Sequence, residues 1–294
     1  MFLRRDDVAC MMRVRNEARW IKRSLERTWA VVRRVVILDD GSTDDTFLQS
    51  MESIGISKME SVLIEHSGSW CVVTGNVPDG ECELHYLHSP FRPSRVRDKQ
   101  ATNEIRDKNF LWEYCKSNVS FKHMLCLDGD EMLSLAALRG FPEAIQQLEL
   151  GVDILNLPFV YLWDQENQRR VDGIYGPRVG FARLNFPRLF SICRVHEDVL
   201  FEMRFAWEGT KGGFHCGSIP RERFFIYGIA PHTGNVWLPI VHFGYLDVEE
   251  RQRKFLFYNW IDPHNEFEGE YAHIIGQPDR HAPGPVELVP WEDQ

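Results

Sequence analysis

The first part of the chain alternates between short apolar runs and segments in which apolar residues recur every three or four positions. Residues 8–14 form an apolar, β-prone run, and Asn16 then offers a capping side chain to a helix. The inward face of that helix is marked at helical spacing by Ala18, Ile21, Leu25 and Trp29. The pattern predicts a strand followed by a helix.

A second unit of the same kind follows. Residues 35–38 resemble a buried strand, and they lead into the sequence DDGSTDDT, in which Gly41 makes the turn. Thr43 or Asp44 can cap the next helix. The predicted inward face of that helix consists of Phe47, Leu48, Met51 and Ile54. Residues 61–64 are predicted to form a third strand.

Residues 67–97 show no clear hydrophobic period. Glycine, proline, serine and histidine are frequent there, which predicts a long loop with one short strand at Leu84–His88. The pattern becomes regular again over Ala101–Cys115, a predicted helix, and this helix precedes a predicted strand at His123–Leu127.

The second half of the chain is less regular. Pro142 is predicted to begin a short helix, and residues 154–162 are predicted to form a strand. Residues 173–235 are rich in glycine, arginine and aromatic residues, which favours a region facing an acceptor substrate. Asp247 is predicted to cap a helix that Pro263 ends, and the proline-rich tail is predicted to be irregular.

This alternation predicts an α/β fold, a Rossmann-like and mostly parallel open sheet flanked by helices, in a single domain. Ligands of such sheets bind outside the carboxyl ends of the strands. Two acidic clusters lie at those ends in the sequence. DDGSTDDT follows one predicted strand, and the other strand runs through MLCLDGDEM into Asp128, Asp130 and Glu131. Carboxylate oxygens suit Mg²⁺ or Mn²⁺, ions that also bind phosphate oxygens, so the second cluster predicts a divalent-cation site.

Composition narrows the class of protein. The chain has 294 residues, of which 44% are hydrophobic, enough for a substantial core. Its formal net charge of -9 argues against nucleic acid as a partner. Seven cysteines without a CxxC pair predict reduced thiols and a cytoplasmic setting. The N-terminus lacks a signal-peptide core, and no apolar stretch approaches the ~20 residues of a transmembrane segment.

Three motifs in their order, NEARWIKRSL, VVILDDGSTDDT and MLCLDGDE, resemble the N-terminal half of family 2 glycosyltransferases of the GT-A fold. The resemblance covers residues 8–135 well and the remainder thinly. It implies transfer of a sugar from a nucleotide-diphosphate donor, with a UDP-sugar favoured, to a glycan or another hydroxyl acceptor. It also implies that residues 1–135 bind the donor and that residues 136–294 shape the acceptor site within the same domain.

The resemblance assigns roles to four aspartates. Asp39 and Asp40 match the positions that bind the nucleotide base or ribose, and carboxylates can accept hydrogen bonds from both. Asp128 and Asp130 match the Asp-x-Asp motif, in which the second aspartate coordinates Mn²⁺ or Mg²⁺ and the first contacts ribose or metal-bound water. The cation neutralises the departing diphosphate. Glu131 either supports this site or is solvated.

Later residues complete the expected site. The sequence VHEDV fits the position of the general base in inverting enzymes, which indicates Asp198, with Glu197 as the second choice. His242 in IVHFGYLD matches a late histidine that completes the metal shell, although a lone histidine is often structural. Arg106 faces either the nucleotide pocket or solvent.

Two sets of residues remain open. Arg188 is either a phosphate or carboxylate partner or an ordinary ion-pair partner. Of four tryptophans in the less regular half, most are expected in the core and one beside the acceptor sugar: Trp163, Trp207, Trp237 and Trp260.

Two other functions fit parts of the pattern. A nucleotidyltransferase acting on sugar phosphates would also use a nucleotide and a divalent ion, but such enzymes have a glycine-rich loop after the first strand, where this chain reads RVRNEARW. A non-catalytic carbohydrate- or nucleotide-binding module would retain the fold without the reaction, and the complete acidic set speaks against it.

Overall fold

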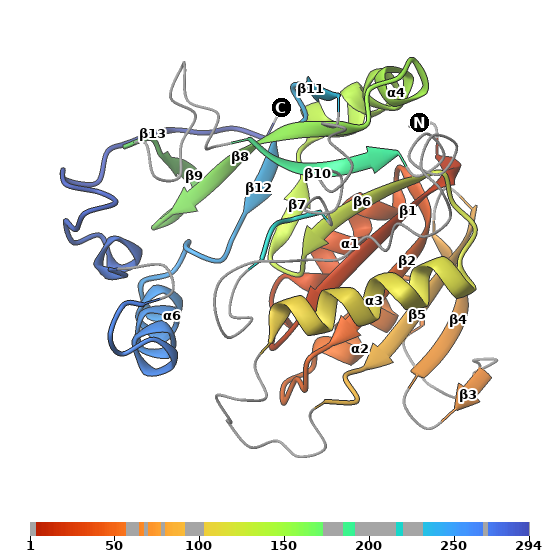
Figure 1. Cartoon of the computed structure of the whole chain (residues 1–294), viewed down its shortest axis with the longest axis horizontal. Coiled ribbons are helices and arrows are strands. Elements are labelled where there is room, and N and C mark those ends of the chain that lie inside the picture. The colour runs from red at the N-terminus through yellow and green to blue at the C-terminus, as the bar shows by residue number, and fades with distance from the viewer. Residues whose placement is uncertain are drawn as a thin grey trace.

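The computed structural model of the chain describes residues 4–56, 65–67, 70–77, 80–91, 103–172, 185–191, 216–219, 232–266 and 270–293. The predicted α/β class is confirmed, because an open sheet with parallel central strands is flanked by helices (Figure 1).

The first two strand–helix units are present as predicted. They consist of β1 (Arg5–Val14), α1 (Ile21–Trp29), β2 (Val32–Asp39) and α2 (Thr46–Glu52). The capping role predicted for Asn16 is wrong, because α1 begins at Ile21 and its N-cap is Trp20. Asn16 instead adopts a φ of 55°, in the left-handed region that asparagine tolerates. Leu48, predicted to face inward, is 48% exposed.

The four central strands run parallel in the order β6 (His123–Asp128), β1, β2 and β5 (Gly80–His88). Parallel neighbours place their carboxyl ends at the same edge of the sheet. The predicted strand before the Asp-x-Asp motif is therefore confirmed, and it lies beside β1.

A hairpin occupies most of the region predicted as a long loop, so the loop prediction is wrong, whereas the short strand predicted at Leu84–His88 is confirmed as the second half of β5. Strand β4 (Trp70–Val77) pairs antiparallel with β5, and the short β3 (Glu65–Ser67) pairs with β4. Alternate residues of β5 enter the core, namely Cys82, Leu84 and Tyr86. Burial of this face stabilises the strand despite its polar neighbours. Residues 61–64 lie outside the described residues.

Helix α3 (Glu104–Asn118) confirms the predicted helix, with a later start. The side chain of Asn103 caps it by accepting a hydrogen bond from the backbone N–H of Arg106 at 2.8 Å. Leu111, Trp112 and Cys115 are buried on its inward face.

Pro142 lies inside a helix and does not begin one, so that prediction is wrong. After β7 (Glu131–Leu133), helix α4 runs over Leu135–Glu149, and Ser134 caps it by accepting a hydrogen bond from Ala137 N–H at 3.0 Å. Proline is unfavourable in a helix interior, because it removes a backbone hydrogen bond. The apolar face of α4, which includes Phe141 and Ile145, is buried and outweighs that cost.

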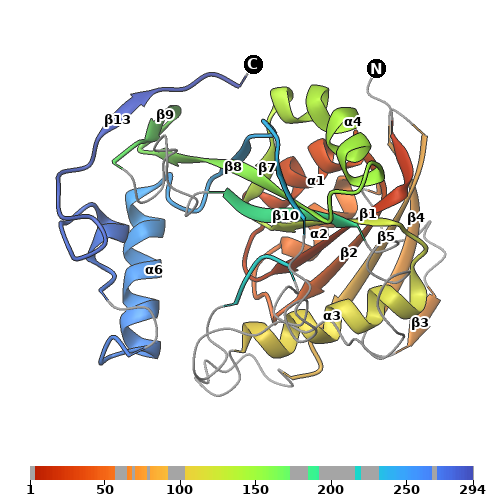
Figure 2. The same cartoon turned by 45° about the horizontal axis from the view of Figure 1, so that its top comes forward.

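The remaining elements add both antiparallel and parallel strand pairs, together with two helices, beside the central strands. They are β8 (Ile154–Trp163), β9 (Gln165–Arg170), β10 (Asn185–Ser191), β11 (Thr233–Asn235), β12 (Ile240–His242), α6 (Val248–Ile261), the 3-10 helix η5 (Ala272–Ile275) and β13 (Leu288–Pro290). Strand β8 and helix α6 confirm two predictions, whereas β13 pairs with β9 in the tail predicted to be irregular. Figure 2 shows α6 apart from the helices that flank the central strands.

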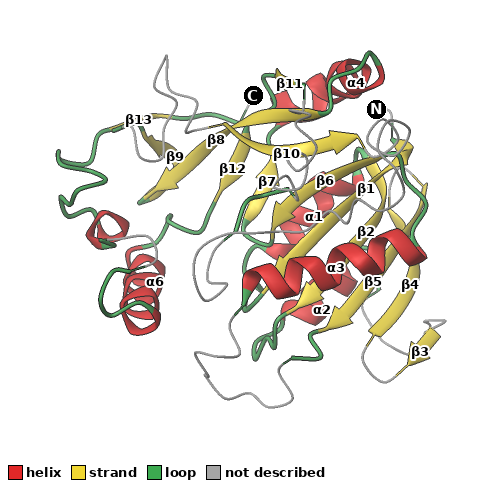
Figure 3. Ribbon diagram, in the orientation of Figure 1, coloured by secondary structure: helices red, strands yellow, loops and turns green. Residues whose placement is uncertain are grey.

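The central sheet is covered on both faces (Figure 3). Helices α1, α2 and α4 cover one face, on which Val8, Cys10, Met12 and Val14 point inward. Helix α3 covers the other face, where Ala9 and Met11 pack against Leu111 and Trp112. The alternation follows from the period of a strand.

Two further expectations concern the chain as a whole. No helix within the described ranges is both long and apolar enough to cross a membrane. All six cysteines that the structure describes are free thiols: Cys10, Cys71, Cys82, Cys115, Cys126 and Cys216.

Candidate active site

The carboxyl ends of the central strands bring the two acidic motifs to one edge of the sheet. In the parallel register, Arg13 lies opposite Asp128, Val14 lies opposite Asp39, and Asp39 lies opposite His88. Successive residues of a strand point to opposite faces, so Asp39 and Asp40 divide between the two sides of this edge.

Asp40 is held in a buried ion pair on the α3 side. Its carboxylate is fully buried and accepts a hydrogen bond from the Arg13 guanidinium at 2.6 Å. Asp107 of α3 accepts from the same guanidinium at 3.0 Å. Burial alone would lower the pKa of Arg13, but the two carboxylates outweigh it and raise that pKa. This triad fixes the ends of β1 and β2 against α3.

Asp39 points to the other side and is 4% exposed. Its carboxylate accepts hydrogen bonds from the Tyr86 hydroxyl at 2.8 Å and from Ser42 N–H at 2.7 Å. Burial first, and then the Asp39 charge, raise the pKa of Tyr86, so the hydroxyl stays a donor. His88 Nδ1 lies 4.0 Å from the same carboxylate.

Asn16 ties the segment after β1 to the DDGST loop after β2. Its side-chain oxygen accepts a hydrogen bond from Thr43 N–H at 2.7 Å, and its own N–H donates to the Ser42 hydroxyl at 2.9 Å. Asp44 accepts from Thr46 N–H at 3.1 Å, at the start of α2. The first two hydrogen bonds connect the loop to the segment after β1, and the third binds the first turn of α2.

The Asp-x-Asp turn is held by the glutamate that follows it. Glu131 is 1% exposed, and its carboxylate accepts a hydrogen bond from Asp128 N–H at 2.9 Å. The Ser24 hydroxyl of α1 donates to the Glu131 carbonyl. Only glycine fits at position 129 without a steric clash, because a Cβ there would lie 2.8 Å from Glu17 Cγ.

Asp130 lies among cationic and imidazole groups from the C-terminal part of the chain. Lys254 Nζ of α6 donates to Asp130 Oδ2 at 2.9 Å, and His242 Nε2 lies 3.8 Å from the same oxygen. Burial would raise the pKa of Asp130, but Lys254 and His242 outweigh it and lower that pKa well below its usual value. Gly244 lies against this cluster, since a Cβ there would overlap the Asp130 carboxylate and the Lys254 ammonium.

Four charged residues near the site were not identified from the sequence. They are Arg13, Glu17, Asp107 and Lys254. Arg13 could have been identified from the sequence, because it is a charged residue near the end of an otherwise apolar strand. Burial first, and then the Asp130 charge, raise the pKa of Glu17 well above its usual value. Lys254 had no local signal, since a lysine on a charged helix is ordinary.

The spacing of Asp130 and His242 fits a divalent cation. Metal–ligand bonds of about 2.1 Å allow two ligand atoms of one ion to lie up to about 4.2 Å apart, and the observed separation is 3.8 Å. Asp128 is half-buried and lies opposite Arg13 in the register of β6 and β1. In the described part of the chain, the ligand atoms of Asp128, Asp130 and His242 do not all lie within 4.8 Å of one another.

The other predicted residues have varied positions. Arg106 stacks on Phe91, with its guanidinium carbon 4.0 Å from the ring centre, and it pairs with Asp107 at 2.8 Å. Glu197, Asp198 and Trp207 lie outside the described residues, as does the side chain of Arg188 on β10. Trp163 is buried, whereas Trp237 and Trp260 are 62% and 39% exposed.

Comparison of the sequence with protein-family models matched none of them, and comparison with curated proteins gave no match either. Solved structures do match. S. aureus TarS 1-349 is 12% identical, with a TM-score of 0.45, over 92% of this chain and 69% of that chain. A crystal structure of the same TarS 1-349 in complex with UDP-GlcNAc is 11% identical, with a TM-score of 0.43, over 92% of this chain and 70% of that chain.

Glucosyl-3-phosphoglycerate synthase from Mycobacterium tuberculosis, in complex with Mn²⁺, UDP-glucose and phosphoglyceric acid, also matches. It is 16% identical, with a TM-score of 0.29, over 53% of this chain and 44% of that chain. The match therefore covers less than half of the synthase and about half of this chain.

Proposed function

We propose that the protein is a glycosyltransferase that moves a sugar from a nucleotide-diphosphate donor, a UDP-sugar by preference, to an acceptor hydroxyl. The observation that carries the proposal is the cluster at Asp130. Two acidic motifs nearly 90 positions apart end β2 and β6, the parallel strands on either side of β1, and His242 and Lys254 reach the second motif from the C-terminal part of the chain. Such an edge suits a nucleotide and its charged diphosphate.

Each residue has a role in this proposal. Asp39 accepts hydrogen bonds from the base or ribose, and Tyr86 and Ser42 orient its carboxylate for that purpose. Asp40 and Arg13 hold the strand ends, and Arg106 borders the nucleotide through its stack on Phe91.

Asp130 and His242 would hold Mn²⁺ or Mg²⁺, with Asp128 beside them at the ribose or a metal-bound water. When bound, this cation would neutralise charge on the diphosphate as the sugar leaves. Lys254 now balances the Asp130 carboxylate, and it can turn to the diphosphate oxygens when a metal takes its place.

The acceptor side rests on the sequence alone. Asp198, with Glu197 as the second choice, is proposed as the base that takes the proton from the acceptor hydroxyl. A single displacement then inverts the anomeric carbon, and NMR of the product anomer tests this step. We propose the corresponding division of labour, with the donor bound by residues 1–135 and the acceptor site shaped by residues 136–294.

The central test is the Asp130→Asn variant in a screen of UDP-sugars with Mn²⁺. We expect transfer to fall roughly a hundredfold or more, because a charge that stabilises the transition state is lost. Mn²⁺-dependent binding of UDP should fall with it. The control is Glu143→Gln on the exposed side of α4, which should retain both.

Circular dichroism must show that both variants are folded. Full transfer by folded Asp130→Asn would reject the proposed site. Release of pyrophosphate in place of a nucleoside diphosphate would identify a nucleotidyltransferase instead.

A further inference from the structure

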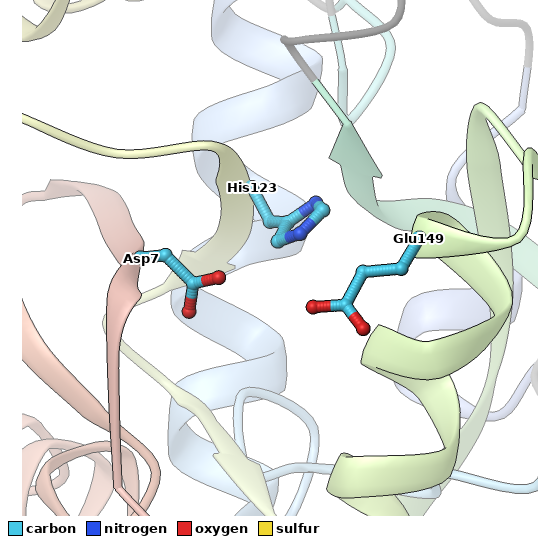
Figure 4. Close-up of side chains that lie close together, drawn as sticks. All are labelled: Asp7, His123 and Glu149. Carbon is cyan, nitrogen blue, oxygen red and sulfur yellow. The ribbon is translucent and has the colours of Figure 1, made fainter.

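A second group of potential metal ligands lies at the opposite end of the central strands. Asp7 is near the start of β1, His123 is the first residue of β6, and Glu149 is the last residue of α4. Each offers one ligand atom, and the three atoms all lie within 4.8 Å of one another. Figure 4 shows the imidazole ring between the two carboxylates.

His123 provides an independent reason to expect a ligand. The residue is 2% exposed, and among the described residues neither of its ring nitrogens has a hydrogen-bond partner. Leaving buried polar atoms unsatisfied costs roughly 1–3 kcal/mol for each group, so native structures rarely do it without a reason. A metal ion bound through one nitrogen removes this cost.

The charges of the bonded groups also favour a cation. Arg5 donates to Asp7 at 2.8 Å and to Glu149 at 2.7 Å, and these three side chains together carry a net charge of -1. Each carboxylate oxygen has a second lone pair, so the carboxylates can bind a metal while Arg5 holds them from outside.

We propose that Asp7, His123 and Glu149 form a Zn²⁺ site with a fourth, open position for water. One imidazole and two carboxylates match the ligands that zinc uses. The ion would join the start of β1 to the start of β6 and the end of α4, three elements far apart in the sequence. This site is separate from the proposed donor site, because His123 and Asp128 are the two ends of β6, about 17 Å apart at ~3.3 Å per residue. It does not depend on the proposed function.

The experiment is isothermal titration of the chelator-stripped full chain with ZnCl₂, together with the visible spectrum of the Co²⁺-loaded protein. We expect one Zn²⁺ equivalent that His123→Gln and Glu149→Gln weaken roughly tenfold or more, with loss of the Co²⁺ absorption bands. His264→Gln is the control, since His264 is exposed on another part of the chain. His242→Gln should also retain the equivalent, because it alters only the other end of the sheet.

Glu149→Gln keeps the test independent of folding, because the Glu149 side chain is 49% exposed. The proposal is overturned if the wild type binds no Zn²⁺. It is also overturned if folded Glu149→Gln and His123→Gln bind as tightly as His264→Gln, or if the equivalent is lost only in His242→Gln.

Discussion

At the scale of single residues, the Asp130–Lys254 pair has the largest consequences. Both side chains are mostly buried, with exposed fractions of 9% and 17%. Removing one partner of a buried pair leaves the other charge without compensation. The pair therefore holds α6 against the Asp-x-Asp turn, and it also reserves a place for positive charge at the proposed donor site.

We predict that Lys254→Gln lowers the free energy of unfolding of the metal-free protein by about 3 kcal/mol, because Asp130 then lacks its counter-charge. Mn²⁺ should restore much of this loss by taking the place of the ammonium. Thermal unfolding with a chelator and with Mn²⁺ measures both effects. Lys22→Gln, which breaks an exposed pair with Glu52, is the matched control and should change little. A variant as stable as the wild type, or one that Mn²⁺ does not stabilise, would contradict this role of Lys254.

At the scale of elements, the turn between β6 and β7 is the most constrained part of the site. Glu131 bonds to the Asp128 backbone, Ser24 of α1 bonds to Glu131, and Glu17 and Val14 pack over Gly129. The turn is thus positioned by side chains from two other segments.

We predict that Gly129→Ala destabilises the protein by about 1–3 kcal/mol through overpacking. The added Cβ would lie 2.8 Å from Glu17 Cγ and 3.0 Å from Val14 Cγ1, so the turn must shift. Mn²⁺ affinity should fall with stability. Gly284→Ala is the control, because a Cβ there has no atom within 4 Å. Chemical denaturation measures the free energy of unfolding of both variants. Equal values would contradict the prediction, because the turn would then accommodate the added Cβ without cost.

Local pattern was sufficient to predict elements whose apolar period is uninterrupted. Strands β1, β2, β6 and β8 and helices α3 and α6 were found in this way. Of the β4–β5 hairpin, only the strand at Leu84–His88 could be predicted, because glycine and polar residues obscure the alternation in the rest of it. The predicted helix start at Pro142 was wrong because proline is common in the first turn of a helix, whereas here Ser134 caps α4 and Pro142 lies inside it.

At the scale of the whole molecule, strand order brings distant residues to one edge. The acidic residues of the site could be predicted because each follows an apolar strand. Lys254 could not, since its approach to Asp130 depends on the path of the chain through β8, β12 and α6. The ends of parallel strands are predictable neighbours, and the residues that a later helix adds are not.

The pH dependence of stability is also a property of the whole molecule. Burial and Asp130 raise the pKa of Glu17 above its ordinary value of 4.5. Between that value and the raised pKa, the native state keeps a proton that the unfolded chain has released. The contribution of Glu17 to stability is therefore complete below 4.5 and is lost as the pH rises through the raised pKa.

We predict that Glu17→Gln removes this loss, because glutamine resembles the protonated acid at every pH. Measured by urea unfolding of the chelated protein, the stability of the variant relative to the wild type should increase between about pH 4 and about pH 8. Glu26→Gln on the exposed side of α1 is the control, with a difference that stays constant. A constant difference for Glu17→Gln as well would mean that Glu17 ionises normally.

The reach of α6 across the molecule bears on how this protein can be recombined with others. A fragment that stops at residue 135 would carry Asp130 without the ammonium that neutralises it, and β7 without its partner β12. Chimeras that exchange residues 136–294 must therefore include a lysine at the position of Lys254. Otherwise the Asp130 carboxylate is buried without a counter-charge. The design of such chimeras must therefore match charges between the two parts as well as the shape of the pocket.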